Sequence, residues 1–235
     1  MHFLCLHGVG TNSKVLELQT SAIRYALGPQ HTYDFVEGAL DHPMAPGISN
    51  LVSPTDTFHA YFAPTSGLSM LSALRDLDSL IAEADPSYDG VLGFSHGSCL
   101  AATLLLHPPQ ARAHHSTFAT LFKVAVFFSA GTAADYAALQ ADEVKMLQQT
   151  QAPGGRATTT IDIPTVHVFA ENDEIAPGQG DLLVGLCSTK GRHVATHRLG
   201  HRIPGAAERN DLDNAVKVIK EAIRDAEARE KESRY

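Results

Sequence analysis

Short apolar runs and stretches with helical spacing alternate along most of the chain. A short apolar run bounded by turn residues is typical of a buried strand, and apolar residues three or four positions apart are typical of an amphipathic helix. Strands are predicted at residues 2–6, 32–37, 88–94, 124–129, 164–170 and 195–199. Helices are predicted at residues 13–26, 70–81, 98–106, 133–149 and 211–228. This order favours an α/β fold, a mostly parallel central sheet of about six strands with helices on both faces.

Two connections between these elements are unusually long. Residues 38–58 are rich in Pro and Gly, and such loops are uncommon in compact domains unless they serve a site. We expect this loop to form one wall of a substrate pocket, with Phe58, Tyr61 and Phe62 at its far end. The alternative is that the three rings only fill core space. Residues 133–160 are expected to form either a small cap over the site or a crossover connection.

The segment YDGVLGFSHGSCLA, residues 88–101, predicts a strand, an abrupt turn and a buried helix. Gly93, Ser95 and Gly97 fit G-x-S-x-G, the pattern of a nucleophile elbow. In an elbow the serine takes a strained backbone conformation that exposes its hydroxyl, and a Cβ on either glycine would strike a neighbouring element. A purely structural Gly/Ser turn has the same letters. The position between a strand and a helix favours the elbow.

Two polar residues that could complete a catalytic triad follow predicted strands later in the chain. Asp173 lies in ENDEIAP and His201 lies in LGHRIP. Because parallel strands end at the same edge of a sheet, we expect both residues to lie near Ser95. The chain order Ser, Asp, His is the one that α/β-hydrolases use. We therefore predict that Ser95, Asp173 and His201 are the catalytic residues of an α/β-hydrolase fold.

Other acids and histidines compete for these roles. Asp173 is preferred over Glu171 and Glu174 because backbone amides can hold a short carboxylate in a turn, and the two glutamates are expected to be exposed. His193 and His197 lie on or near the last strand and are alternatives to His201 as the base. His201 is preferred because it lies in a loop after that strand.

The loop HGVGTN, residues 7–12, joins the first strand to the first helix. A glycine-containing loop at a helix N-terminus can bind a phosphate, but neither G-x-x-x-x-G-K-[ST] nor G-x-G-x-x-G is present. The alternative is an oxyanion hole formed by the amides of Val9 and His96, with Gly8 contributing to the substrate site. The His96 side chain is expected to pack or line the pocket, because elbow geometry turns consecutive side chains to different sides.

These residues predict acyl transfer to water. Ser95 would attack an acyl carbonyl, His201 would accept and return its proton, and Asp173 would orient the imidazole. The reaction requires neither a metal nor an organic cofactor. His114 and His115 are adjacent histidines, but without H-E-x-x-H they predict a solvated loop rather than a metal site.

Composition restricts the class of protein further. The chain has 235 residues and 44% hydrophobic content, which suits one α/β domain over residues 1–235 with a frayed tail from about residue 229. A formal net charge of -8 argues against nucleic-acid binding and gives no sign of a membrane surface. Neither a secretory signal nor a membrane span is recognisable, so we expect a cytoplasmic protein. Cys5, Cys99 and Cys187 are expected to be free buried thiols.

Four segments together resemble the FSH family of small fungal serine hydrolases: LCLHGVGTNS, YDGVLGFSHGS, ENDEIAP and LGHRIP. The resemblance covers nearly the full length and is greatest for thiohydrolases that accompany fungal polyketide synthases. It implies that the family's triad falls on Ser95, Asp173 and His201 and its oxyanion loop on Gly8 and Val9.

The same resemblance implies a substrate class and reveals departures from the family. The implied function is release of a polyketide acyl chain from an acyl carrier protein, as part of fungal secondary metabolism. Members usually carry Gln at His96, a bulkier aromatic residue at Val9, and Gly at Ala170 and Leu199. The backbone amides are available in each case, so these departures affect the shape of the pocket rather than the chemistry.

Alternatives to this function are an esterase or lactonase acting on a free small molecule, and a ligand-binding or carrier-docking protein with a vestigial triad. A basic rim on the site could steer an acidic carrier protein or phosphopantetheine, although the same charges could simply be solvated. The residues considered for this rim are Lys190, Arg192, Arg198 and Arg202.

Overall fold

Six strands pair into one sheet in which every neighbouring pair runs parallel. The structure is a computed structural model that describes residues 1–107, 122–148 and 160–232. The strand order is β2-β1-β5-β6-β7-β8. The bounds of these strands are β1 His2–Leu6, β2 Thr32–Val36, β5 Gly90–Phe94, β6 Val124–Phe128, β7 Thr165–Ala170 and β8 Arg192–His197. All six strands lie within two or three residues of the predicted ones, so the predicted α/β fold is confirmed.

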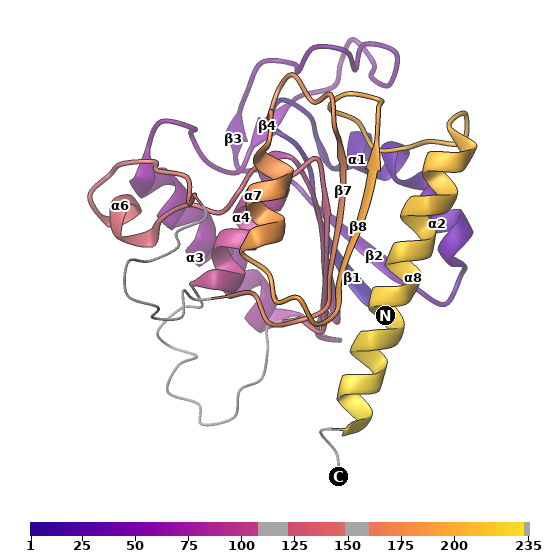
Figure 1. Ribbon diagram of the computed structural model, residues 1–235. Coiled ribbons are helices and arrows are strands. Elements are labelled where there is room, and N and C mark those ends of the chain that lie inside the picture. The colour runs from indigo at the N-terminus through magenta and orange to yellow at the C-terminus, as the bar shows by residue number, and fades with distance from the viewer. Residues whose placement is uncertain (108–121, 149–159, 233–235) are drawn as a thin grey trace.

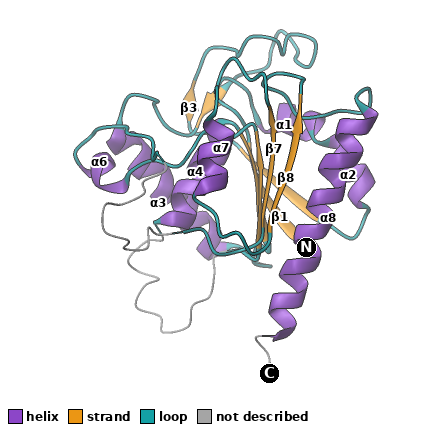
Figure 2. Cartoon of the chain, viewed as in Figure 1, coloured by secondary structure: helices purple, strands orange, loops and turns teal. Residues whose placement is uncertain are grey.

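Helices cover both faces of the sheet, as parallel strands with crossover connections require (Figures 1 and 2). On one side lie α3, α4, α6 and α7, and on the other lie α1, α2 and α8. Their bounds are α1 Ser13–Gln19, α2 Ser21–Leu27, α3 Gly67–Glu83, α4 His96–Leu106, α6 Tyr136–Gln140, α7 Gln179–Gly185 and α8 Arg209–Glu232.

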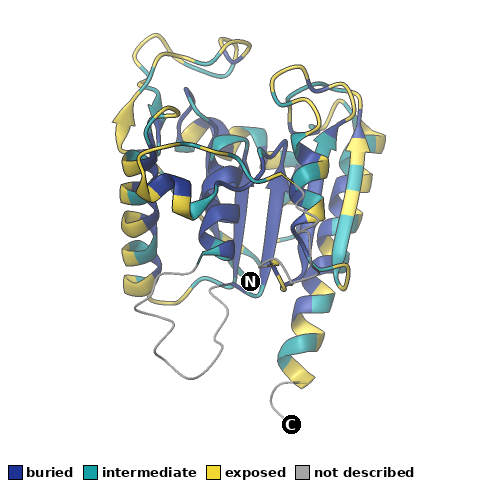
Figure 3. Cartoon of the chain, turned by 60° about the vertical axis from the view of Figure 1, so that its left-hand side comes forward, coloured by how far each residue is buried: buried dark blue, intermediate teal, exposed yellow. Residues whose placement is uncertain are grey.

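The sheet separates two apolar cores, and β1 shows why. Leu4 and Leu6 belong to the core beneath α3 and α4, whereas Phe3 and Cys5 belong to the core beneath α2 and α8. Alternate residues of a strand point to opposite faces, so a continuous apolar run fills both cores. Figure 3 shows these central strands as buried. Burial raises the pKa of the Cys99 thiol to about 12, and all three cysteines are buried and free, as expected.

The helix predicted at residues 13–26 is broken at Thr20 into α1 and α2. The Thr20 hydroxyl donates to the Leu16 carbonyl oxygen at 2.8 Å, and the Arg24 side chain in turn contacts that hydroxyl. A threonine hydroxyl that bonds back to the preceding turn bends a helix. Apolar spacing alone does not reveal this break.

The predicted helix over residues 133–149 is wrong for most of its length. Helix α6 covers only Tyr136–Gln140, and Asp142 then takes a positive φ of 58°. Ala134 instead forms an antiparallel bridge with Met146. Ala and Gln favour a helix locally, but this pairing turns the chain back on itself. Residues 149–159, the remainder of the expected cap, lie outside the described residues.

Two smaller differences concern a loop and the last helix. Within residues 38–58 and just after them, β3 (Leu40–Asp41) and β4 (His59–Ala60) pair as a short antiparallel hairpin. Helix α8 continues past the expected end at residue 228 to Glu232. Its last turns are held because the Arg229 guanidinium donates to the carbonyl oxygens of Asp162 and Lys190. No helix in the described part of the chain is long and apolar enough to cross a membrane.

The buried histidine on β7 predicts a loss of stability in acid. His167 is 1% exposed, and burial lowers its pKa from 6.5 to about 3. Below pH 6.5 the unfolded chain binds a proton there that the folded chain does not, so the free energy of unfolding falls as the pH drops towards 3. The slope for one such group is about 1.4 kcal/mol per pH unit.

We expect the stability difference between wild type and His167→Gln to shrink by about that amount per pH unit between pH 6 and pH 4. Urea unfolding at pH 8, 6, 5 and 4 measures it, and pH 8, where the residue is neutral in both states, serves as the reference. A difference that stays constant from pH 8 to pH 4 would contradict the prediction.

Candidate active site

Ser95 occupies the sharp corner between β5 and α4. Its backbone has φ 51° and ψ -111°, a conformation that L residues rarely adopt. The amide of Ser95 donates to the Phe128 carbonyl oxygen at 2.9 Å, and the Ser95 carbonyl oxygen accepts from Cys99 at 3.0 Å. The side chain makes no capping hydrogen bond to α4. The hydroxyl is therefore free to bond elsewhere.

The two glycines beside Ser95 allow this corner to form. A Cβ on Gly93 would lie 2.7 Å from the Cα of Ser98, and a Cβ on Gly97 would lie 2.6 Å from the carbonyl carbon of Leu6. Both obstacles are backbone atoms, which cannot rotate away as the end of a side chain can. Glycine is thus required at both positions for steric reasons, as the elbow pattern predicts.

His201 links Ser95 to Asp173 in one hydrogen-bonded series. The Nε2 atom of His201 lies 2.8 Å from the Ser95 Oγ, and its Nδ1 atom lies 2.7 Å from Oδ2 of Asp173. The other carboxylate oxygen, Oδ1, accepts from the amides of Ile175 and Ala176, both at 2.9 Å. Asp173 is 8% exposed. The structure brings together all three predicted residues, and the turn amides hold the carboxylate as anticipated.

The competing acids and histidines have other partners. Glu171 is exposed and pairs with Arg198 at 3.3 Å, and Glu174 is exposed as well. His193 contacts Asp225 of α8 at 2.8 Å. His197 Nδ1 accepts from the Leu199 amide at 3.2 Å. None of these hydrogen bonds includes the Ser95 hydroxyl.

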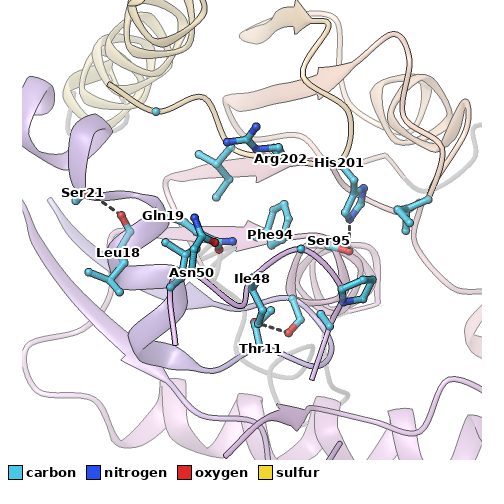
Figure 4. Close-up of a pocket in the computed structure, with 18 of the residues that line it drawn as sticks. Thr11, Leu18, Gln19, Ser21, Ile48, Asn50, Phe94, Ser95, His201 and Arg202 are labelled. Carbon is cyan, nitrogen blue, oxygen red and sulfur yellow. Dashed lines mark hydrogen bonds between the residues drawn. The ribbon is translucent and has the colours of Figure 1, made fainter. Parts of the chain in front are cut away.

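A cavity of about 710 Å³ opens beside Ser95 and His201 (Figure 4). In the view of Figure 4, Leu18, Gln19 and Asn50 lie across the pocket from Ser95 and His201. Most of the lining is apolar, with Phe94 in the middle of the view. The lining residues are Gly8, Val9, Thr11, Leu18, Gln19, Ser21, Ala22, Ala45, Pro46, Gly47, Ile48, Asn50, Leu51, Phe94, Ser95, Ile175, His201, Arg202, Ile203, Gly205 and Ala206.

The long loop forms one wall of this pocket, as predicted, but its aromatic end does not. Phe58, Tyr61 and Phe62 are not among the lining residues. The Tyr61 hydroxyl accepts from the His7 amide and donates to the Val36 carbonyl oxygen, both at 2.8 Å. Phe62 is buried in the core, and Phe58 is half-buried beside the β3–β4 hairpin. The wall consists instead of Ala45–Leu51, which we call the wall loop.

His96 packs against aromatic rings, as expected, although it follows Ser95 directly. Its ring stacks on Phe62 with centroids 3.9 Å apart and on Tyr61 at 6.0 Å. The Phe62 amide donates to the His96 Nε2 atom at 3.4 Å. Burial lowers the pKa of His96 to about 3, helped by neighbouring His7 and His42. A group with that pKa is a weak base at neutral pH.

The two amides predicted for an oxyanion hole are free in the described part of the chain. Neither the Val9 amide nor the His96 amide donates to another protein group, whereas the Gly97 amide donates to the His7 carbonyl oxygen at 3.1 Å. His96 is the first residue of α4, where helical amides have no intrahelical partner. Val9 and Gly8 line the same cavity as Ser95.

The phosphate-loop alternative conflicts with the local hydrogen bonding. Two of the N-terminal amides of α1 are already occupied, because Asn12 accepts from Val15 at 2.8 Å and Glu37 accepts from Ser13 at 3.1 Å. A carboxylate at this position would also repel a phosphate. The loop after β1 therefore lines the cavity with Val9, whose amide is free in the described part of the chain, and the N-terminus of α1 is a poor site for a phosphate.

Of the two alternatives for the basic residues, a rim on the site or separate charges, the structure favours separate charges. Lys190 and Arg192 lie at the start of β8, at the opposite end of the sheet from Ser95. The Arg192 guanidinium donates to the carbonyl oxygens of Val184 and Cys187. Arg198 is paired with Glu171. Only Arg202 of the four lines the pocket.

Several pocket residues were missed by the sequence analysis. Leu18 and Ile175 line the pocket and are 49% and 68% exposed. Ile48 is the buried apolar residue of the wall loop, and an isolated apolar residue in a Pro- and Gly-rich loop is a signal that could have identified it. His114 and His115 lie outside the described residues.

Comparison with known proteins gives the same fold and a family. Esterase FPY3 of Fusarium mangiferae is 41% identical over 230 residues, which cover 95% of this chain and 99% of that protein. Among solved structures, Arabidopsis thaliana SOBER1 has a TM-score of 0.58 at 16% identity, covering 95% of this chain and 99% of the other. Zea mays acyl-protein thioesterase 2 has a TM-score of 0.56 at 18% identity, covering 93% and 92%.

At such low identity the two structural similarities show the fold alone. The family is shown by sequence, because the profile of the family described as Serine hydrolase (FSH1) matches residues 1–223. With the strained serine, the adjoining cavity and the match over nearly the whole chain, this protein belongs to the FSH1 family of serine hydrolases.

Proposed function

We propose that this enzyme hydrolyses an acyl thioester through a Ser95–His201–Asp173 triad, in the release of a polyketide acyl chain from an acyl carrier protein. The observation that carries the triad is the unbroken hydrogen-bonded series from hydroxyl to imidazole to carboxylate, at 2.8 and 2.7 Å. The series opens on an apolar cavity large enough for an acyl chain.

In the first step Ser95 Oγ attacks the acyl carbonyl carbon while His201 Nε2 takes the hydroxyl proton. The carbonyl oxygen becomes an oxyanion and accepts from the Val9 and His96 amides, each contributing roughly 3 to 4 kcal/mol. Asp173 stabilises the imidazolium and keeps Nδ1 protonated. His201 then gives its proton to the leaving group, and the acyl chain remains on Ser95.

In the second step water replaces the leaving group. His201 Nε2 takes a proton from the water as its oxygen attacks the acyl-serine carbonyl, and the same amides hold the second oxyanion. Collapse of this intermediate returns the proton to Ser95 Oγ and releases the acid. The Phe94 ring lies 5.3 Å from that of His201 and packs beside the imidazole.

The thioester preference is supported by the resemblance to polyketide thiohydrolases, and the apolar lining beside Ser95 suits the acyl chain of either kind of ester. A second candidate, a carboxylesterase or lactonase acting on a free small molecule, is favoured by one observation: the relative that is 41% identical is named an esterase. Both reactions use the same residues. A thiolate leaves more readily than an alkoxide because a thiol has a pKa of about 8.5.

A fluorophosphonate probe tests the nucleophile. We expect the wild-type protein to be labelled covalently and Ser95→Ala not to be labelled. Asp173→Asn should react roughly 10⁴-fold more slowly, because it stabilises the wrong imidazole tautomer. Labelling rates followed by in-gel fluorescence provide the measurement.

The control is the circular dichroism melt of each variant, which should match that of the wild type within a few degrees. A folded wild-type protein that resists the probe, or a Ser95→Ala variant that is still labelled, would defeat the proposed triad.

The leaving group can be tested with matched substrates. We expect kcat/KM for octanoyl-pantetheine to exceed that for the oxygen ester of the same acid by roughly tenfold or more, given the lower pKa of the thiol. Octanoyl-loaded acyl carrier protein should be turned over as well. Faster turnover of the oxygen ester would favour the esterase candidate instead.

The role of His96 can be separated from that of His201 by substitution. Because its pKa of about 3 keeps His96 neutral above about pH 4, we expect His96→Gln to keep kcat/KM within about threefold and to leave the acid limb of the pH profile unmoved. His201→Gln is the matched comparison and should lose at least about 10³-fold. A shifted acid limb in His96→Gln would identify His96 as a participating base.

A further inference from the structure

The carbonyl oxygen of Gly8 has three polar contacts close to the site. It accepts from the Thr11 hydroxyl at 2.7 Å and from the Thr11 amide at 3.3 Å. His7 Nδ1 lies 2.7 Å from the same oxygen. His7 and Thr11 are 0% and 3% exposed. Two buried side chains thus converge on one backbone carbonyl.

The Gly8 carbonyl oxygen determines where His7 and Thr11 carry their hydrogens. A carbonyl oxygen can only accept, so His7 Nδ1 carries a hydrogen whether or not Nε2 is also protonated. The Thr11 hydroxyl likewise donates to Gly8. Thr11 is not needed to cap α1, because Asn12 performs that role through Val15. Its hydroxyl is therefore committed to the Gly8 carbonyl.

This arrangement fixes the direction of the next amide. In a planar trans peptide the C=O and N–H bonds point in opposite directions. With the Gly8 oxygen held on the side of His7 and Thr11, the Val9 N–H points the other way, and Val9 lines the cavity beside Ser95. Donors on a carbonyl also strengthen the N–H of the same peptide as a donor.

The His7 ring also has contacts at Nε2, on the side away from Gly8. With its hydrogen on Nδ1, the ring accepts at Nε2 from the Gly38 amide at 3.0 Å, and Oε1 of Glu37 lies 2.8 Å from the same nitrogen. Glu37 also accepts from the Ser13 hydroxyl at 2.9 Å. The imidazole therefore bridges the end of β2 and the Gly8 peptide. Its ring cannot rotate without breaking contacts on both sides.

The backbone of the loop has separate anchors. The His7 amide donates to the Tyr61 hydroxyl at 2.8 Å, and the His7 carbonyl oxygen accepts from Gly97 at 3.1 Å. The Gly10 amide donates to His59 at 2.9 Å. These bonds hold the loop against the elbow and the hairpin. The bonds to the Gly8 oxygen, two from side chains and a longer one from the Thr11 amide, set the orientation of the Gly8–Val9 peptide.

We propose that Thr11 and His7 are positioning residues that aim the Val9 N–H at the oxyanion formed on the substrate. This inference rests on the proposed acyl transfer at Ser95. Neither side chain reaches the reacting atoms. Both act through the Gly8–Val9 peptide, so their contribution should appear in the transition state and not in ground-state binding.

Thr11→Val removes the hydroxyl at nearly constant shape, and Thr11→Ser keeps it. On a p-nitrophenyl ester we expect Thr11→Val to lower kcat roughly ten- to 100-fold with KM changed less than about twofold, since a misaimed donor stabilises the oxyanion poorly. Affinity for a trifluoromethyl ketone, which forms an oxyanion on Ser95, should weaken by the same factor. Thr11→Ser should restore kcat to within about threefold.

A Thr11→Val variant that raises KM at constant kcat, or keeps full affinity for the ketone, overturns the proposal. So does a Thr11→Ser variant as impaired as Thr11→Val. If Thr11→Val fails to fold, two variants of His7 provide the test. His7→Asn places an amide near the position of Nδ1 and should retain more kcat than His7→Gln. The reverse order overturns the proposal. A wild-type protein that ignores the fluorophosphonate probe instead refutes the triad itself.

Discussion

The strained backbone at Ser95 is the constraint on which the site depends. A serine with φ 51° is unfavourable by about 1 to 3 kcal/mol. This backbone conformation persists only because contacts with the surrounding structure stabilise it by more than the strain costs. Those surroundings are the fully buried strand β5 on one side and the almost wholly buried helix α4 on the other. Gly93 and Gly97 let these elements approach closely enough to close the corner.

The parallel sheet brings the other residues of the site close to Ser95. The Gly8–Val9 loop follows β1, Ser95 follows β5, Asp173 follows β7 and His201 follows β8. Because all these strands point the same way, the residues after them meet at one edge. Strand β6 lies between the strands that precede Ser95 and Asp173 and contributes as well, since the Ser129 hydroxyl at its end donates to the Arg202 carbonyl oxygen at 3.4 Å.

The sequence predicted well the polar residues that directly follow a strand, because there both the residue type and its place at the sheet edge indicate a role. Asp173 could be chosen over its neighbours because a turn can supply amides to a short carboxylate, and Ile175 and Ala176 supply them. The sequence analysis missed features that depend on the direction in which a side chain points. Spacing could not show that the Tyr61 hydroxyl turns inward to bridge His7 and Val36.

The basic residues considered for a rim are separated for a related reason. Arg192 and Arg198 are six positions apart near one strand, and at about 3.3 Å per residue they lie roughly 20 Å apart, at opposite ends of the sheet. Basic residues that are close in sequence therefore need not lie on the same part of the protein surface. The predicted helix over residues 133–149 failed because local propensity for Ala and Gln was overridden by the Ala134–Met146 bridge.

The wall loop belongs to no strand of the central sheet and has one residue, Ile48, among the buried hydrophobics. It is tied to the loop after β1 by the hydrogen bond from the Ala45 amide to the Gly10 carbonyl oxygen at 2.7 Å. Substitutions in its exposed part can therefore reshape what the enzyme accepts while leaving the elbow untouched. The wall of the pocket and the elbow can thus change independently in this scaffold, because separate segments of the chain form them.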